Sequence, residues 1–256
     1  MSAASLLDLS APFGPNPGER IPVGIERFSH GAGGAHLAEL VGIDPHELPS
    51  AEAWASERIT AITHSGTHMD APYHYSRTCA GARARTIDEL PLPWFYAPGC
   101  CIDVAAGSGD TLVSSYELAA WERRQGHSVG GGEIVLFHTG AGARFGRPGY
   151  SDVGRGLAPE LVRALVSRGV RVIGTDAWSI DPPYAVMRAR ASARADEAIW
   201  GAHFVGRELE FCALEKLCGL EQLPPFGFTI CCFPIKVQGG SAGWVRAVAI
   251  LERRST

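Results

Sequence analysis

The amino-acid sequence predicts a mixed α/β fold in one compact domain spanning residues 1–256. Short strand-like apolar segments alternate along the chain with segments of helical pattern, which favours strands and helices packed around a common core. The composition is that of an ordinary globular protein, with 46% hydrophobic and 20% charged residues. No repeat or low-complexity segment divides the 256 residues, so we expect a single large core.

The N-terminal half predicts both loops and regular elements. Residues 11–50 are rich in Pro, Gly and His without periodicity, so we expect long loops folded onto the body of the protein. The segment E-R-I-T-A-I-T-H at 57–64 is typical of a strand. Further strands are predicted at 99–105 and 133–139, with a helix between them at 114–126 that ends at Gly126.

The C-terminal half continues the alternation. A second helix is predicted with Pro159 near its start and Gly169 just past its end, and it leads into a strand at 170–176. Residues 228–237 and 244–251 are predicted to be two strands joined by the glycine-rich turn Q-G-G-S-A-G.

Charge, hydropathy and cysteine content exclude several function classes. A net charge of -4 without any run of five or six like charges provides no basic face for nucleic acid. The N-terminal segment lacks the basic start and apolar core of a signal peptide, and no apolar run approaches a membrane span, so we expect a cytoplasmic protein without a membrane partner. Seven cysteines, an odd number without Cys-x-x-Cys, indicate reduced thiols rather than disulfides.

Two short motifs do not fit the chemistry they suggest. Residues 239–243 match the G-x-S-x-G nucleophile elbow, but a strand follows where a helix is needed and no histidine lies beyond His203, so a hairpin turn is expected. The segment G-A-G-A-R-F-G after Thr139 resembles a dinucleotide loop, but the following R-P-G-Y-S cannot open a helix. We therefore expect no nucleotide cofactor.

The segment H-S-G-T-H-M-D-A-P-Y-H concentrates three histidines and one carboxylate in eleven residues. On a helix His64 and His68 would share a face, but Asp70 and His74 would point elsewhere, and Pro72 opposes a helix. In extended chain all four side chains are even steps apart and can project to one side. Extended backbone is therefore the better interpretation.

Imidazole and carboxylate groups without thiolates are typical ligands of Zn²⁺ or Mn²⁺ sites that keep an open position for water. The alternative is that these histidines are only hydrogen-bonded core or surface residues. Four such groups on one face favour a metal, because burying them without a cation leaves several unpaired polar groups.

This segment resembles the His-x-Gly-Thr-His-x-Asp-x-Pro-x-His signature of the metal-dependent cyclase family, which includes bacterial kynurenine formamidases and isatin hydrolases. Residues 174–181, G-T-D-A-W-S-I-D, and the C-terminal K-V-Q-G-G-S-A-G-W-V-R-A-V-A are similar to further family segments. The resemblance covers roughly residues 58–250. It implies a mixed, barrel-like sheet flanked by helices, in the swivelling β/β/α arrangement, assembled into homodimers or homotetramers.

The resemblance also implies a ligand set. His64, His68 and Asp70 would hold one metal, His203 would join Asp70 at a second, and Glu215 would reach both. Judged on their own, His203 and Glu215 in H-F-V-G-R-E-L-E-F-C-A-L-E would be taken for surface or core residues rather than ligands, and the ligand roles come from the resemblance. One or two Zn²⁺ or Mn²⁺ ions per chain are expected.

The implied reaction is hydrolysis of a C–N amide bond in a small cyclic amide or aryl amide. A bound cation lowers the pKa of its water from 15.7 towards about 7 and polarises the carbonyl, so hydroxide becomes available at neutral pH. His74 corresponds to the acid/base histidine of the family rather than to a ligand.

The substrate is less well specified. Kynurenine formamidases usually carry Trp-Pro-Gly-Asp near the N-terminus, whereas residues 16–19 here are N-P-G-E, which argues against formylkynurenine. Trp178 matches a tryptophan of isatin hydrolases, which favours a cyclic amide, although it could equally be a core residue. Tyr73 is a second candidate substrate contact.

Three further interpretations stay open. Arg188, Arg190 and Arg194 could recognise a carboxylate, but a solvated basic face is favoured. A cyclase or dehydratase could use the same site to move protons without adding water. A non-enzymatic protein braced by metal would have every coordination position filled by protein and would need no acid/base histidine.

Overall fold

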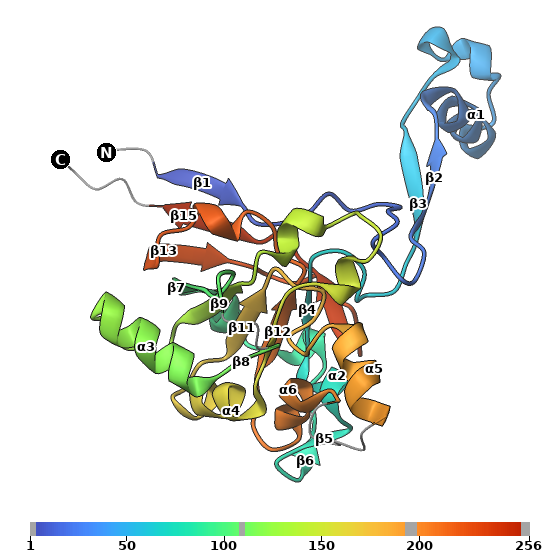
Figure 1. Cartoon of the computed structure of the whole chain (residues 1–256). Helices are drawn as coiled ribbons and strands as arrows, with labels where there is room; N and C mark the ends of the chain where they lie inside the picture. The colour runs from blue at the N-terminus through green and yellow to red at the C-terminus, as the bar shows by residue number, and fades with distance from the viewer. Residues whose placement is uncertain (1–3, 108–110, 193–198, 252–256) are drawn as a thin grey trace.

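The computed structural model describes residues 4–107, 111–192 and 199–251 (Figure 1). The strands are β1 (Ser5–Asp8), β2 (Gly24–Phe28), β3 (Ser56–Thr60), β4 (His68–Asp70), β5 (Thr78–Cys79), β6 (Ala82–Arg83), β7 (Tyr96–Asp103), β8 (Leu112–Val113), β9 (Ile134–His138), β10 (Gly156–Leu157), β11 (Val172–Thr175), β12 (Cys212–Glu215), β13 (Phe226–Cys231), β14 (Ala242–Trp244) and β15 (Val248–Leu251). The α-helices are α1 (His30–Val41), α2 (Pro72–Tyr75), α3 (Ser115–Gln125), α4 (Pro159–Ser167), α5 (Tyr184–Ser192) and α6 (Gly201–Phe204).

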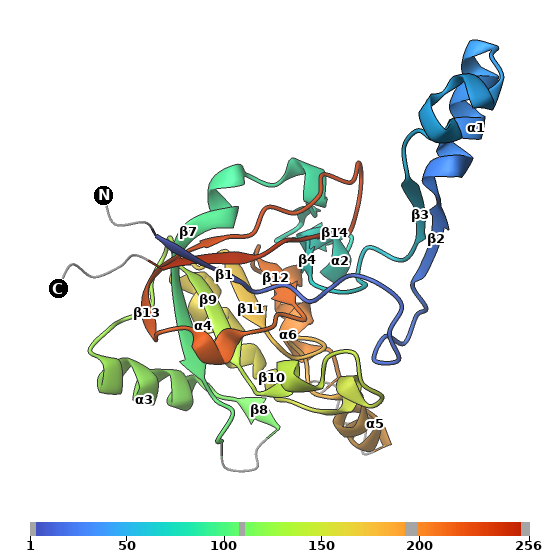
Figure 2. The ribbon, with the colours of Figure 1, turned by 90° about the horizontal axis from the view of Figure 1, so that it is seen from above.

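A nine-stranded mixed sheet organises the molecule, in the order β1-β15-β13-β7-β9-β11-β12-β4-β14. Strands β7, β9, β11 and β12 run parallel, and the flanking pairs are antiparallel. Only residues 245–247 separate β14, at one edge, from β15, next to the other edge. The sheet therefore curls into a half-barrel, as seen from above in Figure 2. This confirms the mixed α/β, barrel-like prediction.

The two faces of the sheet bury separate cores, because successive strand residues point to opposite sides. In β9, Val135 and Phe137 pack with α3, α4 and α6, whereas Ile134 and Leu136 pack inside the curl. Neighbouring strands repeat this alternation. The face that α3, α4 and α6 cover is also the one that carries the chemistry described below.

The two predicted helices are confirmed with the expected ends. Helix α3 begins after Ser114, whose side chain accepts a hydrogen bond from the Glu117 amide, and ends at Gly126 with φ 62°. Helix α4 has Pro159 in its first turn and buries four apolar side chains against the sheet. The helix ends at Ser167, and Gly169, with φ 95°, turns the chain into β11.

The prediction for residues 11–50 was wrong, because much of this segment is regular and projects from the body. Strands β2 and β3 pair antiparallel and carry α1 and two short 3-10 turns away from the sheet (Figures 1 and 2). Helix α1 is glycine-rich for a packing reason: a Cβ at Gly33 would lie 1.9 Å from the Trp54 carbonyl oxygen. We call residues 24–60 the arm.

The predicted C-terminal hairpin needs a second correction. Strands β13 and β15 pair antiparallel as expected, but Ala242 and Gly243 of the predicted turn and Trp244 of the predicted second strand form β14, which pairs with β4. The segment between β13 and β15 therefore passes through β14 at the opposite edge of the sheet. The strand predicted at 57–64 also ends earlier, at Thr60. None of the helices in the described part of the chain has the length and apolarity that a membrane span requires.

Candidate metal centre

The site is built first from two paired strands. Strands β4 and β12 run antiparallel with His68 opposite Glu215 and Asp70 opposite Ala213. The intervening Met69 and Leu214 point into the core inside the curl. Because alternate residues share a face, the side chains of His68, Asp70 and Glu215 lie together on the helix-covered face.

Two further histidines reach the same point by turns rather than by one extended stretch. Gly66, with φ 61°, turns the chain between His64 and β4, and a Cβ there would lie 2.9 Å from the Phe13 ring. After β4, Pro72 opens α2, which carries His74. The rings of His64 and His74 are 4.0 Å apart. The extended-chain argument was therefore wrong in detail, although the four groups do converge.

His203 comes from α6 and is held by Asp181. The Asp181 carboxylate accepts the backbone N–H of Ala202 at 2.9 Å and contacts the His203 Nδ1. This pairing turns the His203 Nε2 towards Asp70 Oδ2, at 3.5 Å, and Glu215 Oε1, at 3.6 Å. A carboxylate behind a histidine is the usual way of fixing the orientation of a metal ligand.

The two carboxylates each face two sets of histidines. Asp70 Oδ1 lies 2.8 Å from His64 Nδ1 and 3.3 Å from His68 Nε2, while Asp70 Oδ2 faces His203. Glu215 Oε2 lies 3.7 Å from His68 Nε2, and its Oε1 faces His203. Both carboxylates can therefore contribute one oxygen to each of two adjacent positions.

The residues fit a cation. Asp70 is fully buried and His68 is 1% exposed, yet His68 Nε2 and both Asp70 carboxylate oxygens have no hydrogen-bond partner among the described residues. Orphaned buried groups of this kind are costly unless an ion satisfies them. Two sets of side chains have candidate ligand atoms that all lie within 4.8 Å of one another. One set is His68, Asp70 and Glu215, and the other is His64, Asp70 and His74.

The electrostatics of the cluster point the same way. Burial opposes the charged form of Asp70, but the neighbouring imidazoles of His74 and His68 outweigh it and hold the pKa of Asp70 well below its usual range. Burial, reinforced by the Asp70 charge, raises the pKa of Glu215. Two carboxylates this close repel each other, and a divalent cation between them would relieve that repulsion.

The protonation state of His74 is set by its surroundings. Burial is the largest influence and lowers the pKa of His74 to about 4. Its Nε2 lies 4.0 Å from Asp70 Oδ2. At neutral pH the imidazole of His74 is therefore in its neutral form, which is the form that a general base requires.

A cavity of about 390 Å³ opens onto these groups. Four candidate ligands and His74 line it, together with aromatic side chains and the pair Glu19 and Lys216. Trp178 and Trp200 form part of its wall, so Trp178 faces the cavity. Tyr73, on α2, is 44% exposed and is not among the lining residues. The volume suits a small molecule.

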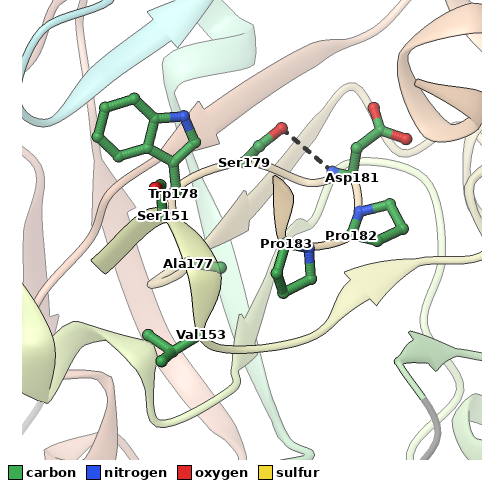
Figure 3. Close-up of a pocket in the computed structure, with 8 residues that line it drawn as sticks. All are labelled: Ser151, Val153, Ala177, Trp178, Ser179, Asp181, Pro182 and Pro183. Atoms are coloured by element: carbon green, nitrogen blue, oxygen red, sulfur yellow. Dashed lines mark hydrogen bonds between the residues drawn. The ribbon is translucent and has the colours of Figure 1, made fainter. Parts of the chain in front are cut away.

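The loop after β11 lines both this cavity and a much smaller one. Figure 3 shows the smaller cavity, of about 10 Å³, with Trp178 and Asp181 at its border and Ser179 Oγ accepting the Asp181 N–H at 3.2 Å. This turn fixes the loop from which Asp181 reaches His203. The loop thus supplies both a wall of the cavity and the support of a candidate ligand.

Sequence reasoning missed several residues of the site. Trp200, with φ 63°, stacks on His203 at 4.6 Å and 8° between ring planes, and no sequence pattern announces it. Asp181 lies at the end of the segment 174–181, but its contact with His203 depends on where the fold places α6. Arg188 and Arg190 bond Asp152 and Thr111 and do not line the cavity, and Arg194 lies outside the described residues.

Comparisons with known proteins decide the family. The Cyclase family model matches residues 7–182. The chain belongs to the cyclase family. The kynurenine formamidase of Salinibacter ruber is 31% identical over 189 residues, covering 73% of this chain and 75% of that protein.

Two isatin hydrolases are also similar. That of Roseibium aggregatum is 27% identical over 208 residues, covering 74% of this chain and 72% of that protein. The solved structure of isatin hydrolase A from Ralstonia solanacearum superposes with a TM-score of 0.76 at 26% identity, covering 97% of this chain and 92% of that one. This cyclase-family member is accordingly an enzyme, a metal-dependent amidohydrolase that acts on non-peptide C–N bonds.

Proposed function

We propose that this enzyme hydrolyses the C–N bond of a small cyclic amide, as isatin hydrolases do, or of an aryl amide, as kynurenine formamidases do. The observation that carries the proposal is the convergence of five candidate ligands, with orphaned buried atoms, beside a cavity of about 390 Å³ that four of them line. The aromatic wall formed by Trp178 and Trp200 favours a planar substrate. Tyr73 stays a predicted substrate contact.

The residues that would hold metal are His64, His68 and Asp70 for one ion and His203 with Asp70 for a second, with Glu215 reaching both. The division of the Asp70 and Glu215 oxygens between two histidine sets supports two ions, Zn²⁺ or Mn²⁺. When bound, such a cation would act as a Lewis acid towards the substrate carbonyl and would lower the pKa of a bound water.

His74 is assigned the proton transfer. Its neutral imidazole accepts a proton from the attacking water and returns it to the leaving nitrogen. The rings of Trp200 and His203 pack edge to face against His74, with ring centroids 5.2 and 5.6 Å away.

The test combines metal content with product analysis. The protein is purified without added metal or chelator, its metals are counted by elemental analysis, and isatin and N-formylkynurenine are offered in ¹⁸O-labelled water. We expect about two ions per chain and one solvent oxygen in the product. Product without solvent oxygen would instead favour the cyclase or dehydratase reaction, and a metal-free protein that stays active would overturn the proposal.

We also propose that the enzyme is a cytoplasmic homo-oligomer, a dimer or tetramer. All seven cysteines are free, which suits a reducing compartment. The arm exposes Leu40, Val41, Trp54 and Ile59, each by 44% or more. A two-stranded ribbon with one helix is marginally stable alone, so a second copy is the expected cover. Light scattering should show a dimer or tetramer that Leu40→Glu with Ile59→Glu dissociates; a monomeric wild type would contradict this.

A further inference from the structure

The segment N-P-G-E is not used by the proposed reaction, yet its last residue is buried in the site. The Glu19 side chain is 4% exposed and lines the cavity. Asn16 Oδ1 accepts the backbone N–H groups of Gly18 and Glu19 at 2.9 and 3.0 Å, which fixes the turn. Glu19 Oε1 then accepts the N–H of Gly66, at 2.7 Å, in the loop between His64 and β4.

Lys216 approaches the same loop from the other side. It follows Glu215 at the end of β12 with φ 59°, and its side chain is 2% exposed. The ammonium donates to Glu19 Oε1 and Oε2 at 3.1 and 2.9 Å and to the carbonyl of His64 at 2.9 Å. An ammonium has three donors, and these contacts use all three.

Together the two side chains hold both ends of the turn. Lys216 binds the His64 carbonyl, and Glu19 binds the Gly66 amide. The Gly66 carbonyl lies 2.8 Å from His68 Nδ1. That contact directs His68 Nε2 towards Asp70, so the turn connects the ion pair to the orientation of a candidate ligand.

The ion pair also contacts the cavity wall. The Lys216 ammonium lies 3.7 Å from the centroid of the Trp178 ring, within the range of a cation–π contact. The Thr67 hydroxyl donates to the Lys216 carbonyl at 2.7 Å, which fastens the start of β4 to the end of β12. Since its donors are occupied, Lys216 is not available as an anchor for a substrate anion.

We propose that Glu19 and Lys216 are a positioning pair, which sets the geometry of His64 and His68 for metal binding by clamping the turn at Gly66. This inference rests on the proposed function only in taking His64 and His68 as ligands. Neither residue touches the reacting atoms.

The test uses Glu19→Gln, Lys216→Met and the double variant. Removing one partner leaves the other charged and buried, which can disrupt folding, whereas the double variant leaves no unpaired charge. Zn²⁺ affinity is measured by competition with a chromogenic chelator, and thermal unfolding of the metal-free protein reports stability. We expect the folded double variant to bind Zn²⁺ about 10- to 100-fold more weakly than the wild type.

Steady-state kinetics give an independent readout. We expect kcat at saturating Zn²⁺ to fall while KM changes little, because the polar atoms of the pair are bonded to each other and to the turn at Gly66. Glu117→Gln is the matched control, since it removes the charge facing Arg155 at 2.8 Å far from the cavity and should leave Zn²⁺ affinity and kcat unchanged.

The outcomes separate the two proposals. The positioning role would be overturned if the double variant had the same Zn²⁺ affinity and kcat as an active wild type and only a lower unfolding temperature. The ion pair would then be purely structural. Wild type that binds neither Zn²⁺ nor Mn²⁺ would overturn the proposed function itself, and the positioning role with it.

Discussion

Glu215 faces His68 across the β12–β4 pair, and its two oxygens point to different histidines, with Oε2 3.7 Å from His68 Nε2 and Oε1 3.6 Å from His203 Nε2. This relationship makes Glu215 the residue that joins the strand half of the site to the α6 half. A carboxylate in that position can bridge two ions.

Glu215→Gln should therefore remove metal from the site. The amide keeps the size of the side chain but loses the negative charge, so we expect the metal content to fall from about two ions to one or none per chain. Elemental analysis after gel filtration checks this, with Glu210→Gln as the control. An unchanged content would show that Glu215 is not a ligand.

His74→Ala should separate catalysis from metal binding. If His74 moves a proton, kcat falls about 10²- to 10⁴-fold while the metal content stays at the wild-type value. His74 also groups with His64 and Asp70 within 4.8 Å, so loss of metal together with loss of rate would identify it as a ligand instead.

Asp181→Asn should weaken metal binding through His203. Asp181 accepts two backbone N–H groups of α6 and contacts the His203 Nδ1, and an amide nitrogen could face that ring in the wrong orientation. We expect about a 10- to 100-fold loss of Zn²⁺ affinity by chelator competition. Asp8→Asn, which disturbs an exposed pair with Arg246, should have no effect on affinity.

Leu161→Ala should destabilise the fold without touching the site. Leu161 is fully buried in the core between α4 and the sheet, and truncation there leaves a cavity. We expect a loss of about 2–5 kcal/mol in the free energy of unfolding by urea denaturation. Arg163→Ala, on the exposed side of the same helix, should change it by no more than about 0.5 kcal/mol.

The Glu117–Arg155 pair should contribute a pH-dependent part of the stability. Burial opposes the charged form of Glu117, but the hydrogen bond from Arg155 outweighs it and lowers the pKa of Glu117 below its ordinary value of 4.5. Because the folded pKa is depressed, this stabilisation is present above pH 4.5 and is lost as the pH falls through the folded pKa.

Urea unfolding of the wild type and Glu117→Gln checks that sign. The wild type should be the more stable near neutral pH, and the difference should shrink as the pH is lowered below 4.5. A difference that grows on acidification would mean that the pKa of Glu117 is raised in the folded state.

The sequence by itself determined the local features of this protein. Ser114 and Gly126 mark the ends of α3, and Pro159 the start of α4, because caps and turns depend on neighbouring residues alone. The spacing of His68 and Asp70 on one strand likewise follows from the period of two. The family was recognisable from the signature at 64–74, before any distance was known.

Other features depended on contacts between residues distant in sequence. The local sequence of the glycine-rich segment does not predict α1. Its glycines are required because the helix packs closely against the backbone of residues 51–54. Ala242 and Gly243 were predicted to lie in a turn, but they form a strand with Trp244 because β4 provides an edge with which they pair.

The site itself was settled by tertiary structure. The cluster is contacted by Asp181, Trp200 and Lys216 because the fold brings α6 and the end of β12 next to it. Such contacts between residues distant in sequence leave no local pattern. The sequence determined which groups could bind a metal. Burial and the orientation of both Asp70 oxygens, which only the fold produces, decided that they face one another around a common position.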